Sequence, residues 1–172
     1  MLDVRRLEGS LMTRLSNEAK ARWDSVASSH RDYVTGVNEL LKAHRDEVVG
    51  LVELGFSHPR DVGIAIGILP TLTMLERQAL LPLMLSLCHP DAYPHVARPF
   101  VLELPREWVI SNVESAAEGL LTSGEYLDWC SVLGVFEELD PTLARRFAVR
   151  MTQHTDGEIR AEGASYLAQH GP

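Results

Sequence analysis

Apolar residues recur at helical spacing along almost the whole chain. The pattern is densest over 57–88, where two apolar segments, 62–74 and 79–88, flank a short polar stretch. Each segment is shorter than the roughly 20 apolar residues that cross a bilayer, and prolines interrupt both. A short helix that is apolar nearly all round is typical of a soluble protein core. We therefore expect 57–88 to form the buried central helix pair of the fold.

Strand patterns are almost absent from the chain. No alternating run of Val, Ile, Thr or Tyr bounded by turn residues occurs. The length of 172 residues suffices for one domain with a sizeable core. The pattern therefore predicts a single all-α domain.

Polar turn motifs return at nearly constant intervals. The first is Ser29-His30-Arg31-Asp32, and from His30 the steps to the equivalent residues are 28, 31, 34 and 32 residues. Those equivalent residues are His58, His89, Ser123 and Thr155. Each interval has room for two helices and two short turns. Helix pairs at a fixed period are the signature of an α-solenoid, a superhelical stack.

This periodicity also predicts how the single domain, 1–172, is organised. N-terminal capping helices are expected over 1–29, about four antiparallel helix pairs over 30–154, and a C-terminal capping helix over 155–172. The second helices of the pairs are expected at 45–54, 73–87, 106–120 and 142–153.

The C-terminal segment carries a more specific pattern. Asp156 is followed by Ile159-Arg160 and then by Leu167, with Gly163 between them. This resembles the D-x-x-V-R-x-x-A-x-x-x-L pattern of HEAT-like repeats of the armadillo/HEAT type, although the family usually has alanine at the position of Gly163. The resemblance implies that Asp156 caps a helix and that Arg160 packs against a neighbouring repeat.

The net charge and the absence of catalytic and metal-binding motifs argue against several classes of function. The formal charge is −8, which disfavours nucleic acid and suits a basic partner. No GxSxG, HExxH or CxxC motif is present, so we expect no catalysis, no metal and no cofactor. Cys88 and Cys130 are expected to be free thiols. The charged N-terminal residues do not resemble a signal peptide, so we expect a cytoplasmic protein without a membrane partner. The size, charge and predicted architecture of the chain suggest a bacterial protein.

Acidic residues cluster on two of the expected second helices. Asp46, Glu47 and Glu53 lie on the first of these helices. Glu107, Glu114 and Glu118 lie on the second. Second helices line the concave face of such stacks, so the carboxylates could form one acidic docking site. The alternative is a solvated face without a partner.

Arginines gather on the expected helix 142–153. Arg145, Arg146 and Arg150 could bind a carboxylate or a phosphate of a partner. The favoured interpretation is that they pair with acids nearby in the sequence. Those acids are Glu137, Glu138 and Asp140.

The three tryptophans differ in their expected surroundings. Trp23 and Trp129 share helical stripes with other apolar residues and are predicted to lie in the core. Trp108 projects away from the apolar stripe of its helix. It is either an exposed interaction hot spot or packs against the preceding helix, 99–104.

Together these patterns predict a non-catalytic protein-binding module with an acidic concave face. By analogy in size, charge and architecture, a narrower hypothesis is an immunity protein that neutralises a basic toxin. The alternatives are a HEAT-like nucleic-acid-processing enzyme of the DNA glycosylase type, and a regulatory scaffold or homodimer. The expected partner-binding residues are Asp46, Glu47, Glu53, Trp108, Glu114, Glu118, Arg145, Arg146 and Arg150.

Overall fold

The computed structural model of the protein describes residues 16–122 and 124–171, and most of these residues lie in helices. Within these ranges 81% of the residues are helical and none lies in a strand, which confirms the predicted all-α class. The chain divides into two compact units, Met1–Val48 and Val49–Pro172. No helix in the described ranges is long and apolar enough to cross a membrane.

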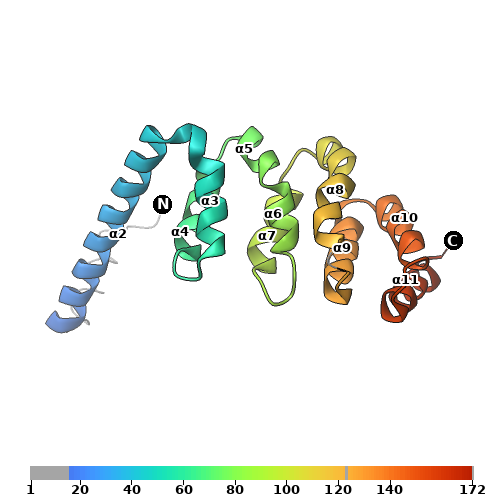
Figure 1. The fold of residues 1–172 in the computed structure, drawn as a ribbon. Coiled ribbons are helices and arrows are strands. Elements are labelled where there is room, and N and C mark those ends of the chain that lie inside the picture. The colour runs from blue at the N-terminus through green and yellow to red at the C-terminus, as the bar shows by residue number, and fades with distance from the viewer. Residues whose placement is uncertain (1–15, 123, 172) are drawn as a thin grey trace, which may run out of the picture. The chain divides into compact units, whose positions relative to one another are not determined.

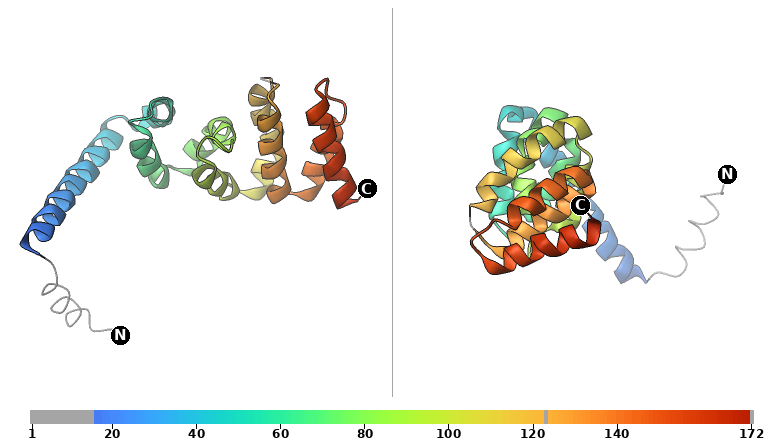
Figure 2. Two further views of the ribbon diagram at one scale, coloured as in Figure 1. Left: turned by 90° about the horizontal axis from the view of Figure 1, so that it is seen from below. Right: turned by 90° about the vertical axis from the view of Figure 1, so that its right-hand side faces the viewer.

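The first unit is dominated by one long helix, α2 (Asn17–Ala43), followed by the 3-10 turn η1 (Arg45–Glu47). The Ser16 side chain caps α2 by accepting a hydrogen bond from the backbone N–H of Ala19. The turn predicted at 29–32 is wrong, because α2 runs through it without interruption (Figure 2). That stretch holds polar residues but neither proline nor glycine, so nothing in it breaks a helix. Of the predicted capping segment 1–29, residues 1–15 lie outside the described part.

The apolar side of α2 is largely open to solvent. Trp23 is 70% exposed, so its predicted place in the core is wrong. Leu41 is the one buried residue of this helix. Helical periodicity correctly predicts which residues share a face, but it does not tell whether another element covers that face.

The second unit is a succession of shorter helices. In chain order these are α3 (Val48–Ser57), α4 (Val62–Ile68), η2 (Leu69–Thr71), α5 (Met74–Ala79), α6 (Leu81–Ser86), α7 (Pro94–Leu102), α8 (Arg106–Leu121), α9 (Tyr126–Leu139), α10 (Pro141–Met151) and α11 (Gly157–His170). From α6 onward, α6 packs against α7, α8 against α9, α9 against α10 and α10 against α11 (Figure 1). Helix α6 also contacts α8, and α9 contacts both α7 and α11.

Prolines divide the apolar stretch 57–88 into short helical pieces. The single helix predicted over 73–87 is wrong, because Pro82 stands in the first turn of α6 and separates it from α5. Proline has no N–H to donate and is tolerated at the start of a helix. Leu80, Leu81, Met84 and Leu85 are at most 1% exposed, so the predicted burial of this part is confirmed.

The other predicted second helices match the structure unevenly. The helix predicted at 45–54 is wrong, because η1 occupies its beginning and α3 extends to Ser57. The helices predicted at 106–120 and 142–153 agree with α8 and α10 to within two residues at each end. The division into caps and repeats stays a prediction.

An aromatic cluster joins α9 to α10. Phe136 and Phe147 meet edge to face with ring centroids 5.0 Å apart. The Phe147 ring also stacks on Trp129 at 5.3 Å. Trp129 is 4% exposed, which confirms its predicted place in the core. These rings bury large apolar areas at one interface, so they contribute strongly to its stability.

Two aspartates begin the last two helices. Asp140 accepts hydrogen bonds from the backbone of α10, and Asp156 accepts them from Glu158 N and Ile159 N of α11. The capping role implied for Asp156 is therefore confirmed. The role implied for Arg160 is not what its contacts show. Its guanidinium donates to the carbonyls of His154 and Thr155 in the turn just before α11.

The Asp156 cap should make α11 sensitive to acid. Backbone hydrogen bonds, first from Ile159 and then from Glu158, hold the pKa of Asp156 below its usual value. A lowered folded-state pKa stabilises the protein above the unfolded pKa of about 4, and that contribution is lost as pH falls through the folded pKa. Asn caps a helix without a charge. The melting temperature of Asp156→Asn should therefore lie below that of the wild type at neutral pH, and the two should converge in acid. A difference that stays constant with pH would contradict the cap's charge dependence.

Candidate functional site

The net negative charge of the protein comes entirely from the second unit. Residues 1–48 contain eight acidic and eight basic side chains. Residues 49–172 contain sixteen acidic and eight basic side chains, and therefore hold the whole formal charge of −8. A surface that attracts a basic partner through net charge therefore belongs to the second unit.

Two ion pairs connect α8 with α10, and we call them the α8–α10 ion pairs. Arg146 Nη2 lies 3.0 Å from Glu114 Oε2. Arg150 binds both carboxylate oxygens of Glu118, at 2.5 and 2.9 Å. Four of the six charged residues predicted on these two helices thus pair with one another and do not form two separate charged patches.

The pairing predicted for these arginines is wrong. Glu137, Glu138 and Asp140 have other partners, because Glu137 lies 3.1 Å from His170 Nε2 and Glu138 lies 2.6 Å from Arg98. Asp140 lies 3.7 Å from Arg106. The third predicted arginine, Arg145, donates to the carbonyl of His170 at 3.3 Å. Arg146 and Arg150 pair instead with carboxylates 32 residues away on α8, so proximity along the chain did not select the partners.

The Glu118–Arg150 pair also covers a buried aromatic ring. The Arg150 guanidinium carbon lies 5.2 Å from the centre of the Trp129 ring. His154 packs against the same indole at 4.7 Å. The hydrogen bond from Arg150 lowers the pKa of Glu118, and the same bond raises the pKa of Arg150. Both groups stay charged near neutral pH, so Glu118 and Arg150 form an ion pair that connects α8 with α10.

The remaining predicted acids lie in separate elements. Asp46 and Glu47 belong to η1 of the first unit, and Glu53 lies on α3. The predicted sharing of one helix by these three residues is therefore wrong. Glu47 lies 3.3 Å from the Nδ1 atom of His44. Glu53 and Glu107 are both exposed.

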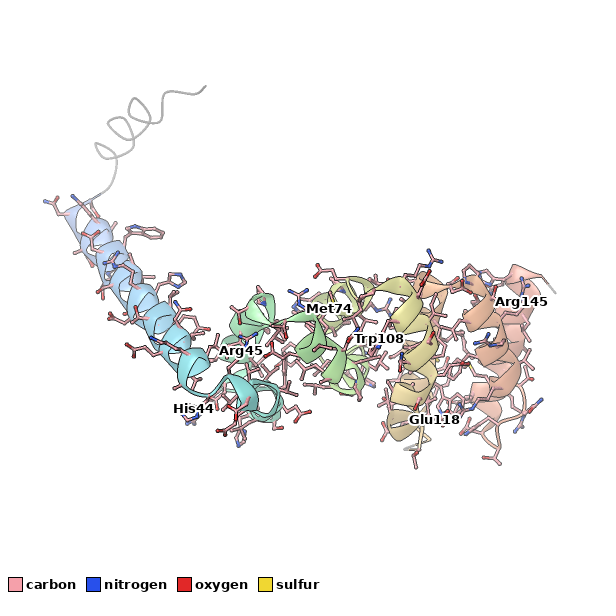
Figure 3. All side chains as sticks on the ribbon, turned by 90° about the horizontal axis from the view of Figure 1, so that it is seen from above. His44, Arg45, Met74, Trp108, Glu118 and Arg145 are labelled. Atoms are coloured by element: carbon pink, nitrogen blue, oxygen red, sulfur yellow. The ribbon has the colours of Figure 1, made fainter. Side chains whose placement is uncertain are left out.

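Trp108 is half-buried near the N-terminal end of α8 (Figure 3). It lines a shallow depression of about 340 Å³ together with residues of α5 and α6. These include Gln78, Leu81 and Pro82. The exposed part of the indole therefore faces this depression, which leaves Trp108 available as a contact residue.

The structure reveals an acidic pocket that the sequence did not predict. It is a shallow, open depression between the beginning of α9 and one side of α11, and it has a volume of about 480 Å³. Tyr126, Glu158, Ala161, Glu162 and Ser165 line it, and we call it the α9–α11 pocket. Glu158 and Glu162 are one helical turn apart, so both carboxylates lie on the same side of α11.

Hydrogen bonds hold one wall of the α9–α11 pocket in place. Tyr126 Oη donates to Glu162 Oε2 at 3.2 Å. Interaction with the Cys130 thiol and then the charge of Glu162 raise the pKa of Tyr126, so the phenol stays protonated. Burial raises the pKa of the free Cys130 thiol as well. The wall is therefore a protonated phenol that orients the Glu162 side chain.

The carboxylates of the α9–α11 pocket have no arginine paired with them among the described residues. Arg160 lies on the same helix but directs its guanidinium to the His154 and Thr155 carbonyls. Two carboxylates one turn apart repel each other, and a cation placed between them would relieve that repulsion. The pocket is therefore suited to accept a guanidinium or ammonium group.

Neither a search for metal-binding groups nor comparison with known proteins assigns a further site or a family. The described residues contain no group of three or more His, Cys, Asp and Glu side chains that could hold a metal ion. Comparison with known proteins gave no relative, because no family model, no curated protein and no solved structure matches the chain.

Proposed function

We propose that this chain is a non-catalytic protein-binding module whose second unit docks a basic partner protein. The observation that carries the proposal is the α9–α11 pocket, where Glu158 and Glu162 are not neutralised by an arginine. Elsewhere in the same unit, carboxylates on α8 are already paired with arginines. An uncompensated pair of carboxylates beside a hydroxyl matches the donors of an arginine or lysine side chain.

The arrangement of α6 to α11 supports a HEAT-like stack as the scaffold for this function. Consecutive helices pack as pairs, and α6 against α8 and α9 against α11 are the contacts expected between neighbouring pairs. Such stacks expose long surfaces and few deep cavities, which suits recognition of another protein. The narrower form of the proposal is an immunity protein that neutralises a basic toxin, and the size and charge of the chain support it.

The nucleic-acid-processing alternative has less support. Seven of the eight arginines of residues 49–172 are in ion pairs or donate to backbone carbonyls. Phosphate binding needs basic groups that face outward together. The exposed charge of the second unit is negative, so a phosphate backbone would be repelled.

Affinity capture with charge variants tests the proposed function. The bait is the full chain, and the source is a lysate of the native host. The wild type should retain a basic protein that Glu158→Gln/Glu162→Gln no longer retains, because the paired carboxylates supply charge-assisted hydrogen bonds. Each such bond contributes about 1.5–3 kcal/mol.

The matched control removes the same charge from the α8–α10 ion pairs. Glu114→Gln/Glu118→Gln should still capture the partner, because these carboxylates are bound to Arg146 and Arg150. Equal loss of capture by both double variants would indicate a general charge effect and overturn the assignment of the pocket. Capture of an acidic protein, or no dependence on either variant, would overturn the proposed function itself.

A further inference from the structure

Helix α2 carries a regular apolar seam. Its members follow one another at alternating steps of four and three residues, and they are Ala19, Trp23, Val26, His30, Tyr33, Val37 and Leu40. A step that averages 3.5 residues keeps a seam facing one neighbouring helix along its whole length. The spacing therefore indicates that α2 pairs side by side with another helix.

Much of this seam is exposed. Trp23 is 70% and Val26 is 62% exposed, and His30 also faces solvent. Val34, beside the seam, is 41% exposed. Tyr33, Val37 and Leu40 are half-buried. A contiguous exposed apolar strip of this kind marks an interaction site.

We propose that the seam binds the same seam of a second copy of this chain in antiparallel orientation. The seam residues form two alternating sets, those reached by a step of four residues and those reached by a step of three. In an antiparallel pair, a residue of one set faces a residue of the other set. In one register, six of the seven seam residues face seam residues of the second copy. In that register Trp23 faces Leu40 of the second copy and Val26 faces its Val37. His30 faces Tyr33 at the centre. The pairing is two-fold symmetric, so every contact occurs twice.

The flanks of this register are compatible with close packing. On one flank Ala27 faces Val34 of the second copy, and both are apolar. On the other flank Ser29 faces Gly36, where a Cβ would meet no atom within 4 Å in the single chain. Small residues on this flank let the two helices approach each other. In the parallel register Trp23 would face Trp23 and His30 would face His30, which is less favourable for both size and charge.

Charge favours a second copy over the basic partner of the second unit. Helix α2 contains four acidic and four basic residues, so it has no net field that selects a basic protein. Arg22, next to the seam, is already paired with Glu18 of the same helix at 2.6 Å, so it leaves no charge that a partner must neutralise. The helix is about 40 Å long, and two such strips bury on the order of 1,000 Å², which a specific interface requires.

Sedimentation of the full chain tests the association. The wild type should be a dimer, and Val26→Asp should raise its dissociation constant by at least about 100-fold, because the carboxylate would be buried in an apolar layer. Ser28→Asp places the same charge on the opposite, exposed side of α2 and should leave the dimer intact. A wild type that is monomeric at all concentrations would overturn the proposal and assign the seam to another occupant. A dimer that survives Val26→Asp would overturn the assignment of its surface.

Cysteine cross-linking tests the register. A mixture of Val26→Cys and Val37→Cys should form an intermolecular disulfide under mild oxidation, because these positions face each other only in the antiparallel pair. Each variant alone should stay uncross-linked, and the wild type controls for Cys88 and Cys130. Cross-linking of Val26→Cys with itself would instead indicate a parallel pair and overturn the proposed register.

Discussion

Replacing Phe136 with alanine should lower the free energy of unfolding by about 3–5 kcal/mol. Phe136 is fully buried, and its ring meets Phe147 at 5.0 Å in the interface of α9 with α10. Truncation removes the apolar area of the ring and leaves a cavity that rigid helices fill only in part. Urea denaturation followed by circular dichroism measures this loss as a lower midpoint at an unchanged slope.

Two other substitutions control for the Phe136 experiment. Phe136→Leu keeps most of the buried volume and should cost less than about 1.5 kcal/mol. Leu75→Ala shortens a side chain that is 78% exposed and should change stability by no more than about 0.5 kcal/mol. A loss for Phe136→Ala as small as that for Leu75→Ala would show that α9 and α10 are not packed around this ring.

Replacing Gly163 with alanine should destabilise the protein by about 1–3 kcal/mol. A Cβ at this position would lie 2.7 Å from the Ala148 carbonyl oxygen and 2.7 Å from the Cβ of Met151. The first neighbour is backbone and cannot rotate away, so α10 and α11 would have to separate. The HEAT-like pattern favours alanine at this position, and by that criterion alone the substitution would be harmless. The denaturation midpoint therefore separates the two expectations.

Gly119→Ala is the matched control for Gly163→Ala. Gly119 lies inside α8, and a Cβ there would meet no atom within 4 Å. Alanine in the interior of a helix is more favourable than glycine by about 0.5–1 kcal/mol, so this variant should be more stable than the wild type. If both alanine variants were stabilised, the close approach of α10 and α11 at Gly163 would be contradicted.

The sequence predicted the parts of the fold that depend on local signals. The absence of strands from the described residues agrees with the hydrophobic periodicity, and α8 and α10 lie close to their predicted bounds. The predicted turn at 29–32 failed because Ser29 and Asp32 are compatible with a helix, and the flanking apolar residues continue the same seam. Hydrophobic periodicity did not predict the helix break at Pro82, which lies in the first turn of a new helix inside one apolar run.

The sequence predicted less of the candidate site, because its contacts join residues far apart in the chain. Glu118 and Arg150 are 32 residues apart, and the nearer acids were the obvious but wrong partners for the arginines. Tyr126 and Glu162 are 36 residues apart, so no local pattern connects them. One local signal was present, since Glu158 and Glu162 are like charges one turn apart on a helix. Two like charges at this spacing destabilise a helix slightly, and a helix tolerates them where they face water or bind a partner.

Titration calorimetry of the captured partner tests the central claim most directly. The claim is that the acidic second unit binds a basic protein through Glu158 and Glu162 of the α9–α11 pocket. The partner should bind Glu158→Gln/Glu162→Gln about 10–100-fold more weakly than the wild type, and Glu114→Gln/Glu118→Gln with nearly wild-type affinity. An affinity unchanged by the pocket variant, with the loss appearing instead in the α8 variant, would contradict the claim.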